Sequence, residues 1–192
     1  MELDIEIKNK LSKKIYSDME KQFPPEEMKD FAKLNELLEK KFYKLAEFSI
    51  KNEPAGYVFF LENEYLWIDY IAVFEKFHSQ GFGSKILTSL FDEYSHLKGC
   101  FFEVEPENPE NIQTIKRIKF YKRLGCHTLD FEYYFPNEIK ELKLDLLYKS
   151  FDGNFPNKNE IKKQVEFVFE NLHNSTKTTQ ATLQLIKIKN QI

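Results

Sequence analysis

The stretch from residue 65 to residue 97 constrains this chain most, because a buried-strand pattern, a glycine loop and a helix pattern follow one another in it. Apolar side chains occupy both alternating faces of Tyr65–Val73, which is typical of a strand covered on both sides. From residue 86 onward, apolar residues recur at spacings of three and four, which predicts an amphipathic helix. The glycines of Gln80–Ser84 therefore lie at a helix start.

This helix start favours an anionic ligand. None of the residues in Gln80–Ser84 is proline, so each keeps its backbone N–H, and glycine allows positive φ and a close approach of a ligand. The helix dipole and the unpaired first-turn donors attract negative charge, so a diphosphate is the expected guest. A Walker loop is excluded because no Gly-Lys-Ser/Thr follows, and a dinucleotide fingerprint fits poorly because Ile86 stands where its third glycine belongs. The alternative is that the glycines only punctuate a loop.

Two segments resemble the GNAT superfamily of N-acetyltransferases. Ala72–Leu87 is similar to the acyl-coenzyme A binding motif of that superfamily, whose pattern is Arg/Gln-x-x-Gly-x-Gly/Ala. Arg117–Cys126 resembles the helix that follows the next strand in the superfamily, which usually ends Phe-Tyr-x-x-x-Gly-Phe. The resemblance covers roughly residues 20 to 150. Two residues depart from the pattern, since His78 replaces the usual Arg or Gln and Cys126 replaces the final Phe.

The resemblance implies an α/β GNAT fold, in which a mixed and mostly antiparallel sheet contains a central parallel strand pair and is flanked by helices. The spacing agrees, because Tyr65–Val73, the helix and Cys100–Glu105 read as a βαβ unit with a right-handed crossover. Ligands of such sheets bind at the carboxyl ends of the strands. We expect a GNAT acetyltransferase domain at 1–151, and a C-terminal helix and tail at 152–192 that pack on or extend the same domain.

The remaining strands and helices are predicted from the same two patterns, alternation along a strand and spacings of three and four along a helix. Strands are expected at 3–7, 43–50, 56–61, 126–135 and 142–151, and helices at 11–19, 26–38 and 111–124 and from residue 161 onward. Lys51–Pro54 is the expected hairpin turn, and Gly99 the expected stop of the helix after the glycine loop. Glu26 and Glu27 open a helix after two prolines; the alternative is that they hold a substrate amine. The polar tail from Asn174 is expected to be loosely ordered or to pair with another subunit.

Composition excludes several classes of protein. With 192 residues, 42% of them hydrophobic, the chain is long and apolar enough for one globular domain with a core. A net charge of −3 gives no general attraction to nucleic acid or to an anionic membrane. The acidic N-terminus is unlike a signal peptide, no apolar run approaches the length of a membrane span, and Cys100 and Cys126 are expected to be reduced thiols. We therefore expect a cytoplasmic protein with no nucleic acid and no membrane as partner.

The resemblance implies acetyl-coenzyme A (acetyl-CoA) as the cosubstrate. The residues that match cofactor-binding positions lie at the end of the central strand, in the glycine loop and at the start of a later helix: Ile71, Ala72, Val73, His78, Ser79, Gln80, Gly81, Phe82, Gly83, Ser84 and Asn111. A backbone N–H around Val73 is implied as the donor to the oxyanion, and neighbouring carbonyls as partners of the pantetheine arm. His78 either donates to a phosphate or lies in solvent. No metal is expected, because the four histidines show no metal-ligand spacing.

Two carboxylates are candidates for the general base. Strand alternation places Glu103 and Glu105 on one face, where like charges, if partly desolvated, raise a carboxyl pKa toward neutrality. Glu103 also matches a strand position at which some family members carry a base. A water chain to Glu103 suffices where the free amine is already partly deprotonated. The alternative is that one or both carboxylates are solvated strand ends.

Tyr121 is the candidate for stabilising the leaving group. It matches the family tyrosine that donates to the departing sulfur. A phenol and a thiol differ in pKa by about 1.5 units, so a hydrogen bond to the developing thiolate is expected and full proton transfer is not required. The alternative is a core tyrosine, because Ile118, Tyr121 and Leu124 share helical spacing.

Both arginines of the chain fall in the basic segment 116–123. Basic residues interleaved with aromatic ones are one signature of a nucleic-acid patch. On a helix, however, these charges spread around the surface, so a solvated helix face is the favoured interpretation.

These features predict an N-acetyltransferase that moves an acetyl group from acetyl-CoA to a primary amine, with a small molecule as the expected acceptor and a monomer or homodimer as the expected state. Acidic residues at the entrance suit a cationic amine: Glu26, Glu27, Glu62, Glu64, Glu103 and Glu105. One alternative is an amine on a peptide or protein. Another is a non-catalytic module that binds acyl-CoA as a sensor or interaction protein.

Overall fold

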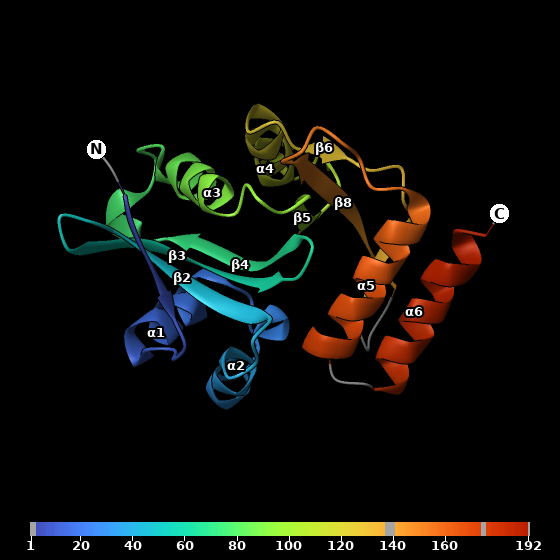
Figure 1. The fold of residues 1–192 in the computed structure, drawn as a ribbon, viewed down its shortest axis with the longest axis horizontal. Helices are drawn as coiled ribbons and strands as arrows, with labels where there is room; N and C mark the ends of the chain where they lie inside the picture. Colours follow the sequence, from blue (N-terminus) through green and yellow to red (C-terminus); the bar gives the residue numbers. More distant parts are fainter. Residues whose placement is uncertain (1–2, 137–140, 174–175, 192) are drawn as a thin grey trace. The chain divides into compact units, whose positions relative to one another are not determined.

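The computed structural model describes residues 3–136, 141–173 and 176–191 (Figure 1). Contacts within the chain separate two compact units, Met1–Leu97 and Lys98–Ile192. The first unit contains the glycine loop, and the second contains Glu103 and Tyr121. Each unit has antiparallel strand pairs and helices of its own.

The sheet of the first unit is antiparallel throughout. Its strands are, in spatial order, β1 (Asp4–Lys8), β2 (Tyr43–Ile50), β3 (Glu53–Glu62) and β4 (Leu66–Val73). Every residue of β3 from Ala55 to Leu61 is buried, because helices cover both faces of this sheet. A strand covered on both sides needs apolar residues at successive positions, which explains the unbroken apolar run in β3.

The turn between β2 and β3 is tighter than predicted. Lys51 and Asn52 have positive φ values of 49° and 65°. Two successive left-handed residues are the pattern of a two-residue type I′ turn, whose twist matches that of the strands it joins. Glu53 and Pro54 therefore belong to β3 and not to the turn.

Three α-helices pack on this sheet. They are α1 (Lys13–Gln22), α2 (Phe31–Leu38) and α3 (Phe82–Glu93), with short 3₁₀ segments η1 (Pro25–Glu27) and η2 (Glu75–Phe77) between elements. Figure 1 shows α1 and α2 on one face of the sheet and α3 on the other. Ser12 and Asp30 cap α1 and α2, because each side chain accepts a hydrogen bond from a first-turn N–H.

The predicted start of the second helix is wrong. Residues 25–27 form only the single 3₁₀ turn η1, and α2 begins at Phe31. Asp30 decides this start, because its Oδ1 accepts a hydrogen bond from the Lys33 N–H at 2.7 Å. Proline and glutamate favour a first turn but do not supply such a cap.

A partly buried ion pair holds the segment between η1 and α2 against β4. The Lys29 Nζ lies 2.9 Å and 3.0 Å from the two carboxylate oxygens of Asp69, and the Tyr43 hydroxyl donates to the same carboxylate. The Tyr70 hydroxyl donates to the Glu27 carbonyl at 2.7 Å and accepts from the Lys29 N–H at 3.1 Å. Side chains of β2 and β4 therefore fix a segment that has little regular structure of its own.

The second unit is organised around β8. Its elements are β5 (Gly99–Val104), α4 (Ile112–Arg123), β6 (His127–Thr128), β7 (Tyr133–Phe135), β8 (Leu142–Ser150), α5 (Lys158–Leu172) and α6 (Lys177–Lys189). β5, β6 and β7 each pair antiparallel with β8. The prediction that Gly99 stops a helix is wrong, because α3 already ends at Glu93 and Gly99 is the first residue of β5. A Cβ at Gly99 would collide with Tyr148 and Lys149 of β8, so a glycine is needed for the close approach of the two strands.

The predicted strand 126–135 is interrupted. β6 and β7 are separate pieces that pair with β8 in different registers, with His127 opposite Tyr148 and Tyr133 opposite Leu144. The residues between the two pieces leave the regular ladder, as in a β-bulge. Leu129, Phe131 and Tyr133 continue the apolar alternation through the break, so the periodicity of the sequence does not reveal it.

The C-terminal tail is a helix, so the expectation of loose order is wrong. α6 buries Ile186, which is 1% exposed. The Lys187 Nζ lies 2.9 Å from a carboxylate oxygen of Glu166 on α5, and the Asn190 Nδ2 donates to the Glu132 carbonyl at 3.1 Å. Neither α6 nor any other helix among the described residues is long and apolar enough to cross a membrane.

Candidate functional site

The glycine loop joins β4 to α3 through two left-handed residues. After η2, Ser79 has a φ of 60° and Gly81 a φ of 78°. Glycine adopts this conformation without steric penalty, and a Cβ at Gly81 would meet no atom of the described residues within 4 Å. The Gln80 side chain turns back and donates to the Lys76 carbonyl at 2.8 Å. The space beside Gly81 at the start of α3 therefore stays open.

The first turn of α3 presents unpaired backbone donors. Gly81 is the N-cap residue and has no side chain to cap the helix, and the first helical hydrogen bond runs from Lys85 N to Gly81 O at 3.3 Å. The N–H groups of Phe82, Gly83 and Ser84 consequently have no partner within the helix. Together with the helix dipole, these donors favour an anion.

The backbone groups of the predicted cofactor-binding residues in β4 point to different edges of the strand. The Phe74 N–H donates to the Ala55 carbonyl of β3 at 3.0 Å. Backbone groups of successive strand residues point to opposite edges, so those of Ala72 point toward β3, whereas those of Ile71 and Val73 point to the other edge. Of the three predicted strand residues, Ile71 and Val73 thus offer backbone groups that β3 does not use.

His78 and Gln22 both contact the carbonyl of Val73. The His78 Nε2 lies 2.7 Å from this oxygen, and the Gln22 Nε2 donates to it at 3.1 Å. The His78 side chain is exposed, yet it is hydrogen-bonded to the backbone, which neither of the two sequence alternatives anticipated. Gln22 lies at the end of α1, and no local pattern in the sequence relates it to Val73.

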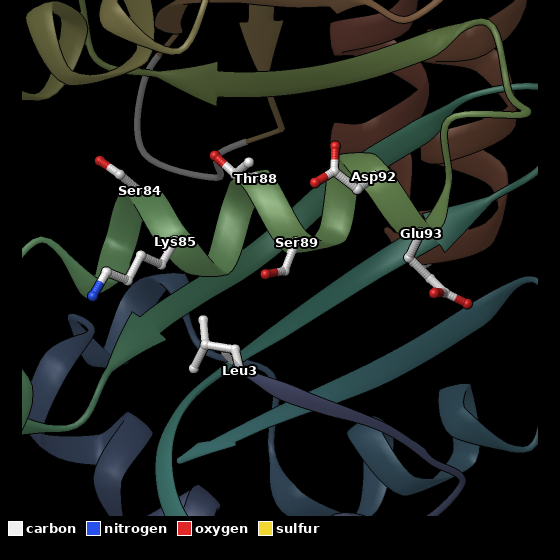
Figure 2. Close-up of a pocket in the computed structure, with 7 residues that line it drawn as sticks. All are labelled: Leu3, Ser84, Lys85, Thr88, Ser89, Asp92 and Glu93. Carbon is white, nitrogen blue, oxygen red and sulfur yellow. The ribbon is translucent and has the colours of Figure 1, made fainter. Parts of the chain in front are cut away.

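An open hollow of about 680 Å³ runs along α3 (Figure 2). The residues that line it come from α3 and from the start of the chain: Leu3, Ser84, Lys85, Thr88, Ser89, Asp92 and Glu93. Figure 2 shows Ser84 and Lys85 at the first turn of the helix and Asp92 and Glu93 at its far end. Of these residues, only Ser84 was a sequence candidate.

Glu103 on β5 is hydrogen-bonded to a buried tyrosine. The Tyr133 hydroxyl of β7 donates to the Glu103 Oε1. β8 brings the two together, since Glu103 is opposite Leu146 and Tyr133 is opposite Leu144 on the same strand. The Tyr133 ring is 0% exposed and packs edge-on against Phe169 of α5, with ring centroids 6.1 Å apart. Sequence reasoning missed Tyr133, because only the register of β7 on β8 relates it to Glu103.

The two candidate carboxylates have different surroundings. β5 ends at Val104, so Glu105 lies just beyond the strand and not in it as predicted. Glu105 is exposed, and one of its carboxylate oxygens lies 3.0 Å from the Arg117 Nη1. Arg117 pairs with Glu105, whereas Glu103 accepts a hydrogen bond from Tyr133, so the two carboxylates have different partners.

Tyr121 is a buried side chain of α4. It is 7% exposed, and its ring centroid lies 4.7 Å from that of Phe102 and 5.1 Å from that of Phe120. Burial raises the pKa of Tyr121 well above the usual value for tyrosine, although the nearby Arg117 opposes the shift. Within the described parts of the chain, no residue forms a hydrogen bond with its hydroxyl.

Asn111 is the N-cap of α4. Its side-chain oxygen accepts a hydrogen bond from the Gln113 N–H at 3.1 Å. Farther along the helix, the Lys122 Nζ lies 3.4 Å from the Glu107 carboxylate. Ion pairs of this kind agree with the solvated face that we expected for the basic segment 116–123.

Cys100 and Cys126 are buried free thiols. Burial raises the pKa of Cys100 well above its usual value and that of Cys126 to about 12. Both side chains are therefore protonated and unreactive at neutral pH. In the described ranges, no three His, Cys, Asp or Glu side chains lie close enough together to hold a metal ion.

The order of β4, the glycine loop and α3 defines a class of α/β protein in which a strand leads into a helix start whose N–H groups favour an anion. The sequence pattern of the Acetyltransferase (GNAT) family matches residues 10–126. The chain therefore belongs to the GNAT family and is an acetyltransferase, which confirms the resemblance drawn from the two motifs.

Relatives support this assignment. The chain is 28% identical over 165 residues to YjbC of Bacillus subtilis, which is described as an acetyltransferase; the match covers 82% of this chain and 80% of YjbC. A GNAT-family structure from Bacteroides thetaiotaomicron superposes with a TM-score of 0.71 at 22% identity, over 85% of this chain and 94% of that one. A GNAT acetyltransferase from Elizabethkingia anophelis, solved with acetyl-CoA bound, superposes with a TM-score of 0.58 at 18% identity, over 77% and 97% of the two chains. The predicted fold class, an α/β GNAT fold, is confirmed.

Proposed function

We propose that this GNAT acetyltransferase moves the acetyl group of acetyl-CoA to the primary amine of a small molecule. The observation that carries the proposal is the start of α3, where Gly81 leaves the first-turn donors uncapped. A diphosphate is the part of acetyl-CoA that such donors suit. The relative from Elizabethkingia anophelis, which has the same fold, was solved with acetyl-CoA.

The first unit supplies the binding groups in this proposal. The N–H groups of Phe82, Gly83 and Ser84 receive the diphosphate, and the backbone groups of Ile71, which β3 does not use, pair with the pantetheine arm like a neighbouring strand. The Val73 N–H then donates to the oxygen of the thioester as it becomes an oxyanion.

The second unit supplies the groups that handle protons. A nitrogen–carbon bond forms when the amine attacks the thioester carbon, and the carbon–sulfur bond breaks when the tetrahedral intermediate collapses. Glu103 accepts the amine proton, directly or through a water. Tyr121 donates a hydrogen bond to the departing thiolate, and its raised pKa favours hydrogen bonding over loss of its proton. Glu105 remains a weaker candidate, because Arg117 already pairs with it.

The acceptor is proposed to be a small cationic amine because acidic side chains were expected at the entrance. Two of those acids are neutralised within their own units, since the Glu62 carboxylate lies 2.6 Å from the Lys44 Nζ and Glu105 pairs with Arg117. The acceptor screen should therefore include neutral amines and short peptides beside polyamines and aminoglycosides. Acetyl-CoA-dependent thiol release with a peptide alone would move the assignment to a protein or peptide acceptor. Binding without release to any amine would favour an acyl-CoA sensor.

Gly81→Ala tests the cofactor site. Alanine at a φ of 78° strains the loop by roughly 1–2 kcal/mol and places a Cβ in the open space beside the first-turn donors. The loop should relax away from the geometry that receives the diphosphate, so we expect the calorimetric Kd for acetyl-CoA to rise about fivefold or more. Gly153→Ala is the matched control, because Gly153 has a φ of 83° and equally open surroundings but lies in a loop of the second unit. Both variants should lose similar stability, and only Gly81→Ala should bind more weakly. Equal Kd values for the two variants would contradict the proposed site.

A further inference from the structure

The peptide group at the end of β4 is held from both sides. The Phe74 N–H donates to the Ala55 carbonyl at 3.0 Å. The Val73 carbonyl belongs to the same peptide group, and it accepts from the Gln22 Nε2 at 3.1 Å and contacts the His78 Nε2 at 2.7 Å. Rotation of this peptide group would break hydrogen bonds on both edges of the strand. The end of β4 is therefore held more firmly than by the β3 ladder alone.

The Gln22 amide is itself held in place. Its nitrogen lies 2.6 Å from the Oδ2 of Asp18, one turn earlier on α1, and this oxygen also accepts from the Tyr57 hydroxyl at 2.8 Å. Tyr57 is 0% exposed on β3 and packs edge-on against Phe74 at 5.6 Å. An amide nitrogen has two hydrogens, so Gln22 can donate to Asp18 and to Val73 at once. A continuous set of hydrogen bonds thus runs from the core of the sheet to the end of β4.

His78 contributes a hydrogen at a defined ring atom. A carbonyl oxygen only accepts, so the contact with Val73 requires that Nε2 carry the hydrogen. The sequence pattern that this loop resembles has Arg or Gln at the position of His78, and both of those side chains donate N–H groups as well. An N–H donor is therefore present at this position of the loop, although the residue type differs from the pattern.

We propose that Gln22 and His78 are positioning residues that hold the Val73 end of β4 so that the Val73 N–H faces the thioester oxygen. The inference rests on the proposed function, in which this N–H stabilises the oxyanion. Neither side chain is required to touch the reacting atoms. A preorganised donor contributes more to the transition state than to ground-state binding, so loss of either contact should lower kcat and leave the binding of acetyl-CoA nearly unchanged.

The rival role for His78 is a contact with a cofactor phosphate. Acetyl-pantetheine separates the two roles, because it carries the thioester and the pantetheine arm but no phosphate. Removal of a phosphate ligand would weaken the reaction with acetyl-CoA and leave the reaction with acetyl-pantetheine as it was. Removal of a positioning residue would slow both reactions by the same factor.

The kinetic test measures His78→Ala, Gln22→Ala and the double variant with acetyl-CoA and with acetyl-pantetheine. A neutral hydrogen bond is worth about 1 kcal/mol, so we expect kcat to fall about three- to tenfold in each single variant, with KM for acetyl-CoA changed by less than about twofold. His78→Gln should recover most of the activity, because it restores an N–H donor. Lys21→Ala is the control, since Lys21 is an exposed residue of the last turn of α1, next to Gln22.

Equal rates for His78→Ala, Gln22→Ala and wild type would overturn the proposal. A loss confined to acetyl-CoA would also overturn it and make His78 a phosphate ligand. Nitrogen NMR of the histidine rings, assigned with His78→Ala, should show His78 with its hydrogen on Nε2; a hydrogen on Nδ1 would exclude the contact with Val73. A wild-type protein that binds acetyl-CoA but acetylates nothing would contradict the proposed function itself, while the NMR result would still decide whether His78 holds Val73.

Discussion

Tyr121 and Tyr133 are both buried, yet their hydroxyl groups meet different surroundings. Tyr133 donates to Glu103, whereas the hydroxyl of Tyr121 has no hydrogen-bond partner among residues 3–136, 141–173 and 176–191. Burial raises the pKa of Tyr121, so its hydroxyl stays protonated throughout the neutral and mildly alkaline range. A protonated hydroxyl with an unused hydrogen is suited to a leaving thiolate.

Tyr121→Phe is expected to lower kcat about tenfold or more and to leave KM for acetyl-CoA within about twofold, because a hydrogen bond to a charged group is worth about 1.5–3 kcal/mol. Steady-state thiol release at saturating amine measures this effect. Tyr16→Phe on α1 is a control that removes a hydroxyl from a tyrosine whose ring packs against Phe31. Wild-type kcat in Tyr121→Phe would reduce Tyr121 to a packing residue.

Tyr133→Phe removes the hydrogen bond that the Glu103 carboxylate accepts. Such a bond stabilises the charged form, so its loss should move the acid limb of the kcat/KM profile to higher pH. The measurement is the pH–rate profile between pH 5 and 9. Tyr134→Phe is the matched control, since the neighbouring hydroxyl accepts from the Lys189 Nζ at 2.9 Å instead. An acid limb that stays in place would mean that Glu103 is not the titrating base.

The ends of helices and strands in this chain are set by individual capping and turn residues, and not by the position at which the apolar periodicity stops. Asp30 starts α2 although acidic residues occur earlier, and the left-handed pair Lys51 and Asn52 shortens the β2–β3 turn. α6 is the converse case, because specific contacts hold a helix that the apolar pattern did not predict. It has few apolar residues, but Ile186 is buried and Lys187 pairs with Glu166 of α5.

Two isoleucines of α6 test whether this helix is an integral part of the second unit. Ile186 is 1% exposed and Ile188 is 60% exposed. Ile186→Ala should lower the free energy of unfolding by about 2–4 kcal/mol, whereas Ile188→Ala should change it by less than about 0.5 kcal/mol. Urea denaturation followed by circular dichroism gives both values. Equal effects at the two positions would show that α6 does not pack through this face in solution.

Buried tyrosine hydroxyls and cysteine thiols make the free energy of unfolding of the whole molecule sensitive to alkaline pH. Burial raises the pKa of Tyr43, Tyr57, Tyr121 and Cys100, and that of Cys126 from 9.0 to about 12. Between pH 9 and 12 the unfolded chain has released protons that the folded chain keeps. The stability that these groups contribute is therefore full below about pH 8 and falls as the pH rises.

The free energy of unfolding should decrease by about 1.4 kcal/mol per pH unit for each such proton, measured by urea denaturation at pH 8, 9.5 and 10.5. Cys126→Ala should reduce this slope by the contribution of one proton, about 1.4 kcal/mol per pH unit, whatever its effect on the free energy of unfolding at pH 8. A stability that does not change between pH 8 and 10.5 would show that these groups titrate normally in the folded protein.

The family resemblance of two motifs was sufficient for the fold class, and sequence periodicity for most elements, because strands such as β3 and helices such as α4 are determined by local patterns. The loop motif likewise identified the glycine-opened start of α3. The contacts of Glu103 with Tyr133 and of Val73 with Gln22 could not be predicted. They join residues that are 30 and 51 positions apart, and they depend on strand register and on the placement of α1.

The ion pair between Lys29 and Asp69 attaches the segment between α1 and α2 to β4, just before α2 begins. The Tyr70 hydroxyl adds a second attachment at the Glu27 carbonyl, and because this contact uses only the backbone, it does not depend on the side chain at position 27. The segment can therefore tolerate changes at such positions while the helix that follows it stays attached to β4. Thiol-release assays on variants of the residues before Lys29 that retain the Lys29–Asp69 ion pair would show whether this segment influences the choice of acceptor.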